Sequence, residues 1–116
     1  MDDNKKKDTK ELEKLKEKYG KVMTLKLQTH DGKEIEIYLR PLDGLPSYFG
    51  TMSRAISLSE QDKSVGAGEI ILRSTYVGGA FGKQLKEYDK ETPEFLSACY
   101  HCSKLVRVLQ GNFTVT

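Results

Sequence analysis

Two runs in which every second residue is apolar flank the segment His30-Asp31-Gly32. The apolar positions are Met23, Leu25 and Leu27 before it and Ile35, Ile37 and Leu39 after it. A period of two is typical of a strand with one buried face, and an Asp-Gly pair between two such runs favours a turn. We therefore predict an antiparallel β-hairpin over residues 22–40, with His30 exposed beside the turn.

The length of the loop decides the register of this hairpin. A two-residue loop would pair Leu27 with Glu36 and would mix apolar and polar side chains on both faces. A three-residue loop, with Gly32 in the left-handed conformation, pairs Leu27 with Ile35. All six aliphatic side chains then share one face, and Lys26 lies opposite Glu36 on the other face. We predict the three-residue loop.

The N-terminal residues predict a short charged helix. Residues 1–8 contain nothing to bury and are expected to be disordered. Leu12, Leu15 and Tyr19 then form a narrow apolar stripe at helical spacing, and Gly20 ends the helix. A helix this short is marginal alone in water, so we expect it to dock on the rest of the chain or on a partner.

A second helix is predicted after Pro46, a residue that suits the first helical turn. Its apolar positions are Leu45, Phe49, Met52 and Ile56, with Tyr48 and Ala55 beside them. The glycine-bearing segment 59–68 is expected to be a polar loop. Residues 69–77 fit a strand by propensity and a helix by spacing, and we favour the helix.

The clearest helix signal lies at residues 93–110. Thr92 is a good N-cap, Pro93 fits the first helical position, and Glu94 suits the positive end of the helix dipole. The helix has a wide apolar face, which has to be buried. That face contains Phe95, Cys99, Cys102, Val106 and Leu109.

These elements together predict an α+β fold. Phe113 and Val115 alternate with polar residues and predict a terminal strand that extends the β-hairpin to three antiparallel strands. The sheet packs against three to four helices, with the 93–110 helix over its apolar face. We divide the chain into a charged N-terminal arm with a short helix, residues 1–19, and a single α+β domain, residues 20–116.

Composition and charge exclude several classes of protein. The chain has 116 residues, of which 37% are hydrophobic and 31% charged, as expected of one soluble domain. No apolar run has the length of a membrane span, and no basic stripe carries interleaved aromatic residues, so we expect neither a membrane nor a nucleic acid as partner. Two cysteines are too few for the disulfide framework of a small secreted fold, which favours a reducing compartment.

No residue pattern indicates catalysis. Cys99 and Cys102, with His101 between them, lack the four ligands of a zinc site, and their place on the apolar stripe predicts core packing. The glycine-rich segments 66–68 and 78–83 do not complete a dinucleotide or phosphate-binding motif and are expected to form turns. We expect no catalytic residue, no cofactor and no metal site.

Four short motifs and a last helix that carries cysteines follow one another along the chain. They are Glu-Lys-Tyr-Gly-Lys-Val at 17–22, Ile-Tyr-Leu-Arg-Pro-Leu at 37–42, Glu-Ile-Ile-Leu-Arg at 69–73 and Val-Gly-Gly at 77–79. In this order they resemble small uncharacterised proteins of tailed phages and prophages of gut bacteria, which in turn look like tail assembly chaperones. The resemblance implies a β-hairpin followed by helices. It also implies binding of the tape-measure protein or of tail components during virion assembly, often as an oligomer.

We therefore expect a non-enzymatic phage morphogenesis protein, similar to tail assembly chaperones, in the host cytoplasm. Its expected partners are other phage structural or assembly proteins, with a homo-oligomer as a further option. Such binding needs exposed apolar surface on a soluble body. The candidate partner-binding residues are Leu12, Leu15, Tyr19, Tyr48, Phe49 and Met52. The same stripes could instead complete the chain's own core.

Two other functions stay open at this point. One is a structural virion component, such as a capsid or tail decoration protein, which would be located in the virion. The other is a small phage protein that binds and inhibits a host protein.

Overall fold

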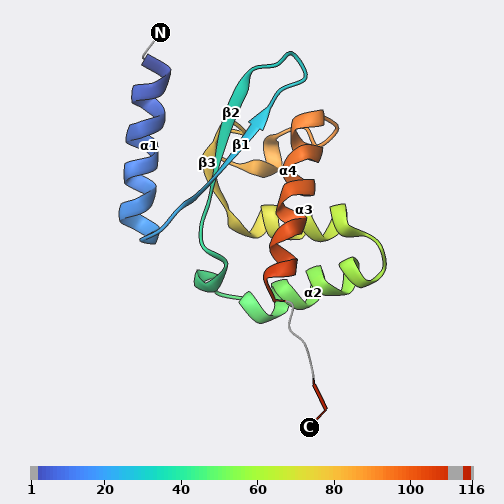
Figure 1. Cartoon of the computed structure of the whole chain (residues 1–116). Coiled ribbons are helices and arrows are strands. Elements are labelled where there is room, and N and C mark those ends of the chain that lie inside the picture. The colour runs from blue at the N-terminus through green and yellow to red at the C-terminus, as the bar shows by residue number, and fades with distance from the viewer. Residues whose placement is uncertain (1–2, 110–113, 116) are drawn as a thin grey trace.

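The computed structural model describes residues 3–109 and 114–115, and Figure 1 shows how they are arranged. The elements in chain order are α1 (Asp3–Tyr19), β1 (Met23–Gln28), β2 (Glu34–Leu39), η1 (Leu42–Gly44), α2 (Tyr48–Glu60), α3 (Ser64–Thr75), β3 (Tyr76–Gly79), η2 (Leu85–Glu87), α4 (Pro93–Ser103) and η3 (Lys104–Leu109), where η marks a 3₁₀-helix. The strands form one antiparallel sheet in the order β1-β2-β3. The α+β fold with a three-stranded antiparallel sheet is therefore confirmed.

The register of the β-hairpin is the predicted one. Leu27 pairs with Ile35, and Lys26 pairs with Glu36. Gly32 has a φ of 88°, the left-handed conformation that the three-residue loop requires. The buried aliphatic side chains of the hairpin share one core with side chains of α3 and α4, and Ile37 at the centre of the hairpin is 0% exposed.

The third strand comes from a different segment than expected. The chain passes directly from α3 into β3 at Thr75, so residues 69–77 are helical up to that position and extended after it. β3 then pairs with β2, with Tyr38 opposite Gly78. The predicted terminal strand falls partly outside the described residues, and Thr114 and Val115, which are described, form no strand.

The predicted polar loop at 59–68 is also wrong, because two helices meet there. α2 continues to Glu60 and α3 begins at Ser64. Gly68 is buried inside α3 rather than in a turn, and a Cβ atom at this position would lie 1.7 Å from the carbonyl oxygen of Cys99 in α4. The absence of a side chain at Gly68 therefore allows the backbones of α3 and α4 to approach each other closely.

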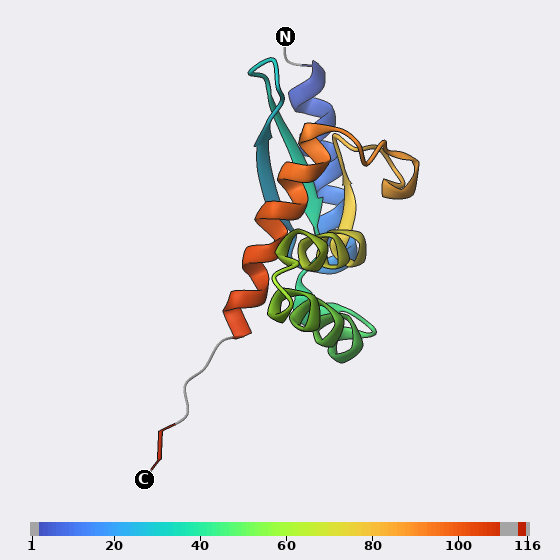
Figure 2. The same ribbon diagram turned by 90° about the vertical axis from the view of Figure 1, so that its right-hand side faces the viewer.

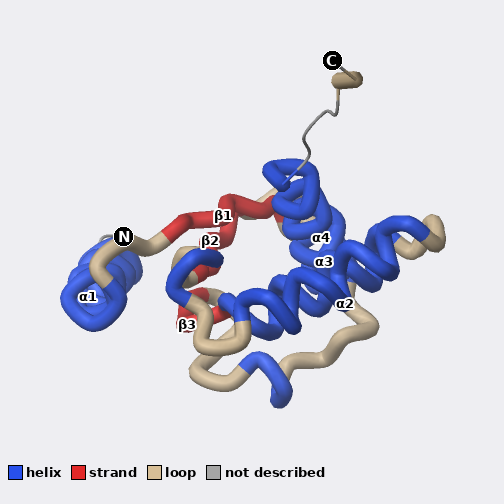
Figure 3. Tube along the Cα trace, turned by 90° about the horizontal axis from the view of Figure 1, so that it is seen from below, coloured by secondary structure: helices blue, strands red, loops and turns tan. Residues whose placement is uncertain are grey.

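Helix α1 lies on the opposite side of the sheet from α3 and α4, as Figure 3 shows, and contacts β3. It begins at Asp3, within the segment expected to be disordered. The Cδ1 atom of Leu15 would lie 3.3 Å from a Cβ at Gly78, and the Glu11 carboxylate accepts a hydrogen bond of 3.0 Å from the Gly79 N–H. The charged arm thus packs on the domain, and the sheet lies between α1 and the layer of α3 and α4.

Helix α4 begins as the sequence predicts and runs along the sheet, as Figure 2 shows. The Thr92 hydroxyl accepts a hydrogen bond of 3.2 Å from the Phe95 N–H, and Pro93 occupies the first turn. The α-helix ends at Ser103, and a 3₁₀-helix continues to Leu109 in place of the α-helix expected to residue 110. Within residues 3–109 and 114–115, every helix is too short or too polar to span a bilayer.

Candidate functional site

One side of α2 presents apolar side chains to solvent. Phe49 is 85% exposed and Ile56 is 36% exposed. The two residues are seven positions apart, so they lie two turns apart on the same side of the helix. The side of α2 that faces α3 carries Met52 and Ala55, which are 3% and 0% exposed. We call Phe49 and Ile56, together with the small residues Gly50, Ser53 and Ser57, the α2 patch.

The outer side of α2 carries small residues between and beside the two apolar side chains of the α2 patch. A Cβ atom at Gly50 would meet no heavy atom within 4 Å. Gly50 is therefore not needed for close packing against another part of the chain. Ser53 and Ser57 are exposed and lie on the same outer part of the helix. The patch therefore combines an aromatic anchor with small neighbours that let another backbone come close.

The turn before α2 fixes where the α2 patch lies. Arg40 follows β2 directly, and its Nη2 donates a hydrogen bond of 2.6 Å to the carbonyl oxygen of Gly44 in η1. The same guanidinium lies 5.0 Å from the ring centroid of Tyr19, at the end of α1. Arg40, at the end of β2, thus contacts both the end of α1 and the segment that leads into α2.

The six residues proposed from the sequence as partner-binding separate into three groups. Met52 is buried in the core, and Tyr48 is half-buried and packs against the core. The three α1 residues, Leu12, Leu15 and Tyr19, are half-buried on the helix that docks on the chain's own sheet. Phe49 is the member of the set that presents most of its side chain to solvent.

A second exposed pair lies on α4 and was missed from the sequence. Leu96 and Tyr100 are 56% and 49% exposed and are one turn apart. The ammonium of Lys104 lies 4.9 Å from the centroid of the Tyr100 ring, so part of that ring already has a cationic contact. Leu96 and Tyr100 are four residues apart and lie outside the apolar stripe that carries Cys99 and Cys102. This spacing could have identified the pair in the sequence.

The cysteines pack in the core, as predicted. Cys99 and Cys102 are 2% and 1% exposed. Burial raises the pKa of the Cys99 thiol to about 11 and that of Cys102 to about 12, with Glu69 adding to the first shift and Cys99 to the second. In the described part of the chain, no three His, Cys, Asp or Glu side chains come together as a metal site would require.

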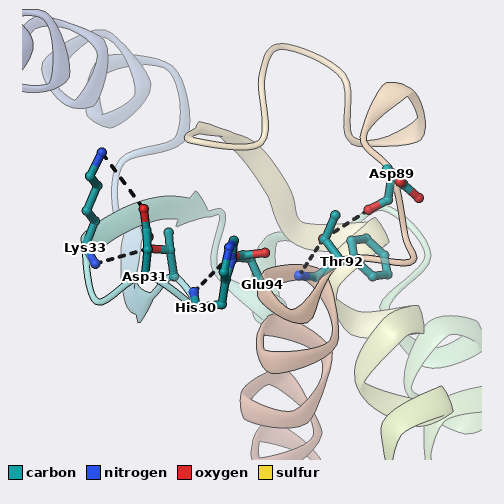
Figure 4. Close-up of polar contacts among 8 residues, drawn as sticks. His30, Asp31, Lys33, Asp89, Thr92 and Glu94 are labelled. Atoms are coloured by element: carbon teal, nitrogen blue, oxygen red, sulfur yellow. Dashed lines mark hydrogen bonds and ion pairs between the residues drawn. The ribbon is translucent and has the colours of Figure 1, made fainter.

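The tip of the β-hairpin is fastened to the start of α4, as Figure 4 shows. The Glu94 carboxylate accepts a hydrogen bond of 3.2 Å from the His30 backbone N–H, and its Oε1 also lies 3.2 Å from the His30 Nδ1. Hydrogen bonds from the backbone N–H of Glu94 itself, and then from His30, lower the pKa of this carboxyl. His30 is exposed, as predicted, with a side chain 75% exposed, but its contact with Glu94 was not predicted. This contact fixes the hairpin against the helix.

Comparisons of the chain with protein-family models, with curated proteins and with solved structures found no match.

Proposed function

We propose that this chain is a non-enzymatic protein of phage tail assembly that holds an apolar segment of a tail or tape-measure protein in the host cytoplasm. The assignment to phage assembly is supported by the resemblance of the motifs at 17–22, 37–42, 69–73 and 77–79 to small proteins of tailed phages. The binding role is supported by a single structural observation, the 85% exposure of Phe49 on the α2 patch.

An exposed phenylalanine on a helix favours contact with a partner on energetic grounds. Burying a side chain of this size is worth roughly 1.5–3 kcal/mol relative to leaving it in water. Phe49 recovers little of this free energy within its own chain because most of its side chain is in water. A partner that covers the ring recovers it on binding, and aromatic residues are enriched at such interfaces.

The surroundings of Phe49 indicate the kind of segment that fits. Gly50, Ser53 and Ser57 are small, so a helix that packs across them can come close to the α2 backbone. An amphipathic helix with a narrow apolar stripe would bury Phe49 and Ile56 in one contact. We therefore propose an amphipathic helix of the tape-measure or tail protein as the bound segment.

Co-expression with the tape-measure protein of the same phage genome tests this function. We expect the chain to raise the soluble fraction of the tape-measure protein and to co-purify with it. Phe49→Ser should abolish both effects. Tyr100→Ser is the matched control, because it removes an exposed aromatic side chain from a different helix, and it should retain both effects.

Three outcomes would overturn the proposal. Co-purification of Phe49→Ser at the level of the unaltered chain would remove the α2 patch as the binding surface. Stoichiometric copies of the chain in purified virions would instead establish a structural component. Retrieval of a host protein in place of a phage protein would favour the inhibitor function. Equal urea midpoints for the unaltered chain and both variants would show that the fold is intact.

A further inference from the structure

Strand β1 forms one edge of the sheet, because it is the outer strand in the order β1-β2-β3. Lys26 lies opposite Glu36, whose carbonyl oxygen accepts a hydrogen bond of 2.9 Å from the Ala80 N–H, beyond the end of β3. The backbone groups of Glu36 therefore point toward β3, and those of Lys26 point away from β2. The same holds for Thr24 and Gln28, since the direction alternates along a strand. In the part of the chain that the structure describes, no backbone group bonds to these outward groups.

The opposite edge of the sheet, at β3, is partly occupied by α1. Gly79 lies opposite Ile37, and its N–H points away from β2 because the next residue, Ala80, bonds to β2. The Glu11 carboxylate of α1 accepts a hydrogen bond of 3.0 Å from this N–H. A strand added beside β3 would have to displace that carboxylate. A strand added beside β1 would displace no hydrogen bond within the described residues, so β1 is the edge that is open to pairing.

The side chains of β1 set two requirements for a strand that pairs with it. Met23, Leu25 and Leu27 share the face that packs on the core, but Met23 and Leu25 are only half-buried there. An added strand completes their burial if it carries apolar residues on the same face. Lys26 is the single charged residue of β1 and lies on the other face, next to the neutral and exposed Thr24. The added strand therefore also needs a residue other than a cation opposite Lys26.

A second copy of β1, related by a two-fold axis, meets both requirements in one register. The two registers that overlap most of β1 are centred on Leu25 and on Lys26. With Leu25 opposite Leu25 of the second copy, Met23 lies opposite Leu27, and the apolar faces of the two sheets become continuous. Lys26 then lies opposite Thr24, and the outward backbone groups of these two residues bond to each other. The register centred on Lys26 would place two lysines opposite each other, which is unfavourable.

We propose that two copies of this chain pair antiparallel through the outer edges of β1, in the register centred on Leu25, and form a dimer. The pairing joins the two three-stranded sheets into one continuous sheet. Each copy contributes the same strand, so the contact is symmetric and closes at two copies. The carboxylate of Glu11 at the β3 edge opposes growth of the sheet on its other side. The contact does not use Phe49, so it is independent of the function proposed above.

Two substitutions at the exposed residue Thr24 test the contact and its register. Thr24→Lys places a second lysine opposite Lys26 at both symmetric positions and should weaken the dimer. Thr24→Glu, the matched variant, places a carboxylate opposite Lys26 and should strengthen it. We expect the dissociation constants of the two variants to lie on opposite sides of that of the unaltered chain and to differ by a factor on the order of ten. Equal circular dichroism spectra and urea midpoints, measured where all three chains are monomeric, would show that the fold is kept.

Sedimentation velocity over a range of protein concentration measures the dissociation constants. We expect the unaltered chain to pass from monomer to dimer as its concentration rises. Amide hydrogen exchange adds a measurement that needs no variant. Exchange at the outward amides of Thr24 and Lys26 should slow as the dimer forms. The amides of Leu25 and Leu27 point toward β2 and should exchange slowly at every concentration.

Each alternative gives a different result, and each would overturn the proposal. A chain that is monomeric at all concentrations would show that β1 does not pair with a second copy, and slow exchange at Lys26 in that monomer would show that the edge is covered within one chain. A dimer that neither substitution at Thr24 affects would place the contact elsewhere. Equal weakening by Thr24→Lys and Thr24→Glu would exclude the register that sets Thr24 opposite Lys26. Species larger than a dimer would exclude a symmetric contact.

Discussion

Replacing Gly68 with alanine should force the backbones of α3 and α4 apart. A Cβ atom at this position would lie 1.7 Å from the carbonyl oxygen of Cys99, 2.7 Å from its carbonyl carbon and 2.9 Å from the amide nitrogen of Ser103. These are backbone atoms of α4, so no side-chain rotation relieves the clash. The shortest distance has to double to reach an ordinary contact of 3.4 Å.

The cost follows from the side chains that pack near this crossing. Ile71 and Leu72 in α3 and Cys102 in α4 are 0%, 0% and 1% exposed, and they lose close contacts when the helices separate. Overpacking of a core costs about 1–3 kcal/mol, and more where the backbone must move. Alanine returns about 1 kcal/mol through its higher helix propensity. We expect Gly68→Ala to lower the free energy of unfolding by about 2 kcal/mol.

Gly50→Ala is the matched control on α2. An added Cβ there meets nothing within 4 Å, so the helix propensity acts alone and should raise the free energy of unfolding by up to about 1 kcal/mol. Urea unfolding followed by far-ultraviolet circular dichroism measures both variants. We expect them to differ by about 3 kcal/mol. Equal stability of Gly68→Ala and Gly50→Ala would refute a close crossing of α3 and α4 at Gly68.

Four further predictions concern α4, two of them its cysteines. Cys99 and Cys102 should resist alkylation at pH 8 until the chain unfolds, because their pKa values of about 11 and 12 keep both thiols protonated. As the pH rises, the thiols of the unfolded chain lose their protons before those of the folded chain. The free energy of unfolding should therefore fall above pH 9, by at most about 1.4 kcal/mol per pH unit for each thiol. A variant with alanine at both Cys99 and Cys102 should lack this slope. Glu94→Gln should lower the urea midpoint at pH 7. The difference from the unaltered chain should narrow as the pH falls below 4.5, because the lowered pKa of Glu94 stabilises the fold only while the carboxyl is ionised, and a difference that stays constant with falling pH would contradict this. Thr92→Ala should cost about 1 kcal/mol of unfolding free energy and Thr92→Ser much less, because serine keeps the oxygen that accepts the N–H of Phe95.

The β-hairpin could be predicted to the residue because its register depends on local information. Of the two-residue and three-residue loops, only the three-residue loop puts all six aliphatic residues on one face, and it requires a left-handed residue where Gly32 stands. The start of α4 was equally local, since Thr92 and Pro93 act within one helical turn. Patterns that are decided within a few residues of each other can be interpreted without knowing the fold.

The third strand could not be predicted because its pairing is long-range. No glycine or proline separates α3 from β3, and the change from helix to strand at Thr75 occurs because β2 has a free edge there. Gly68 shows the same limit. A glycine that lets two helices cross and a glycine in a turn look alike in the sequence, and the difference lies in Cys99, which is distant along the chain.

The candidate site shows how a stripe at helical spacing can contain both core and surface. Phe49 and Met52 are three positions apart, which places them about 60° from each other around the helix axis. That angle is enough for Met52 to reach the core at 3% exposure while Phe49 stays in water at 85%. Which of the two is buried depends on where α3 packs, and no residue of α2 carries that information. The α2 stripe is wider than the surface that α3 covers, and the uncovered part, which carries Phe49, is where we propose that a partner binds without any change in the core.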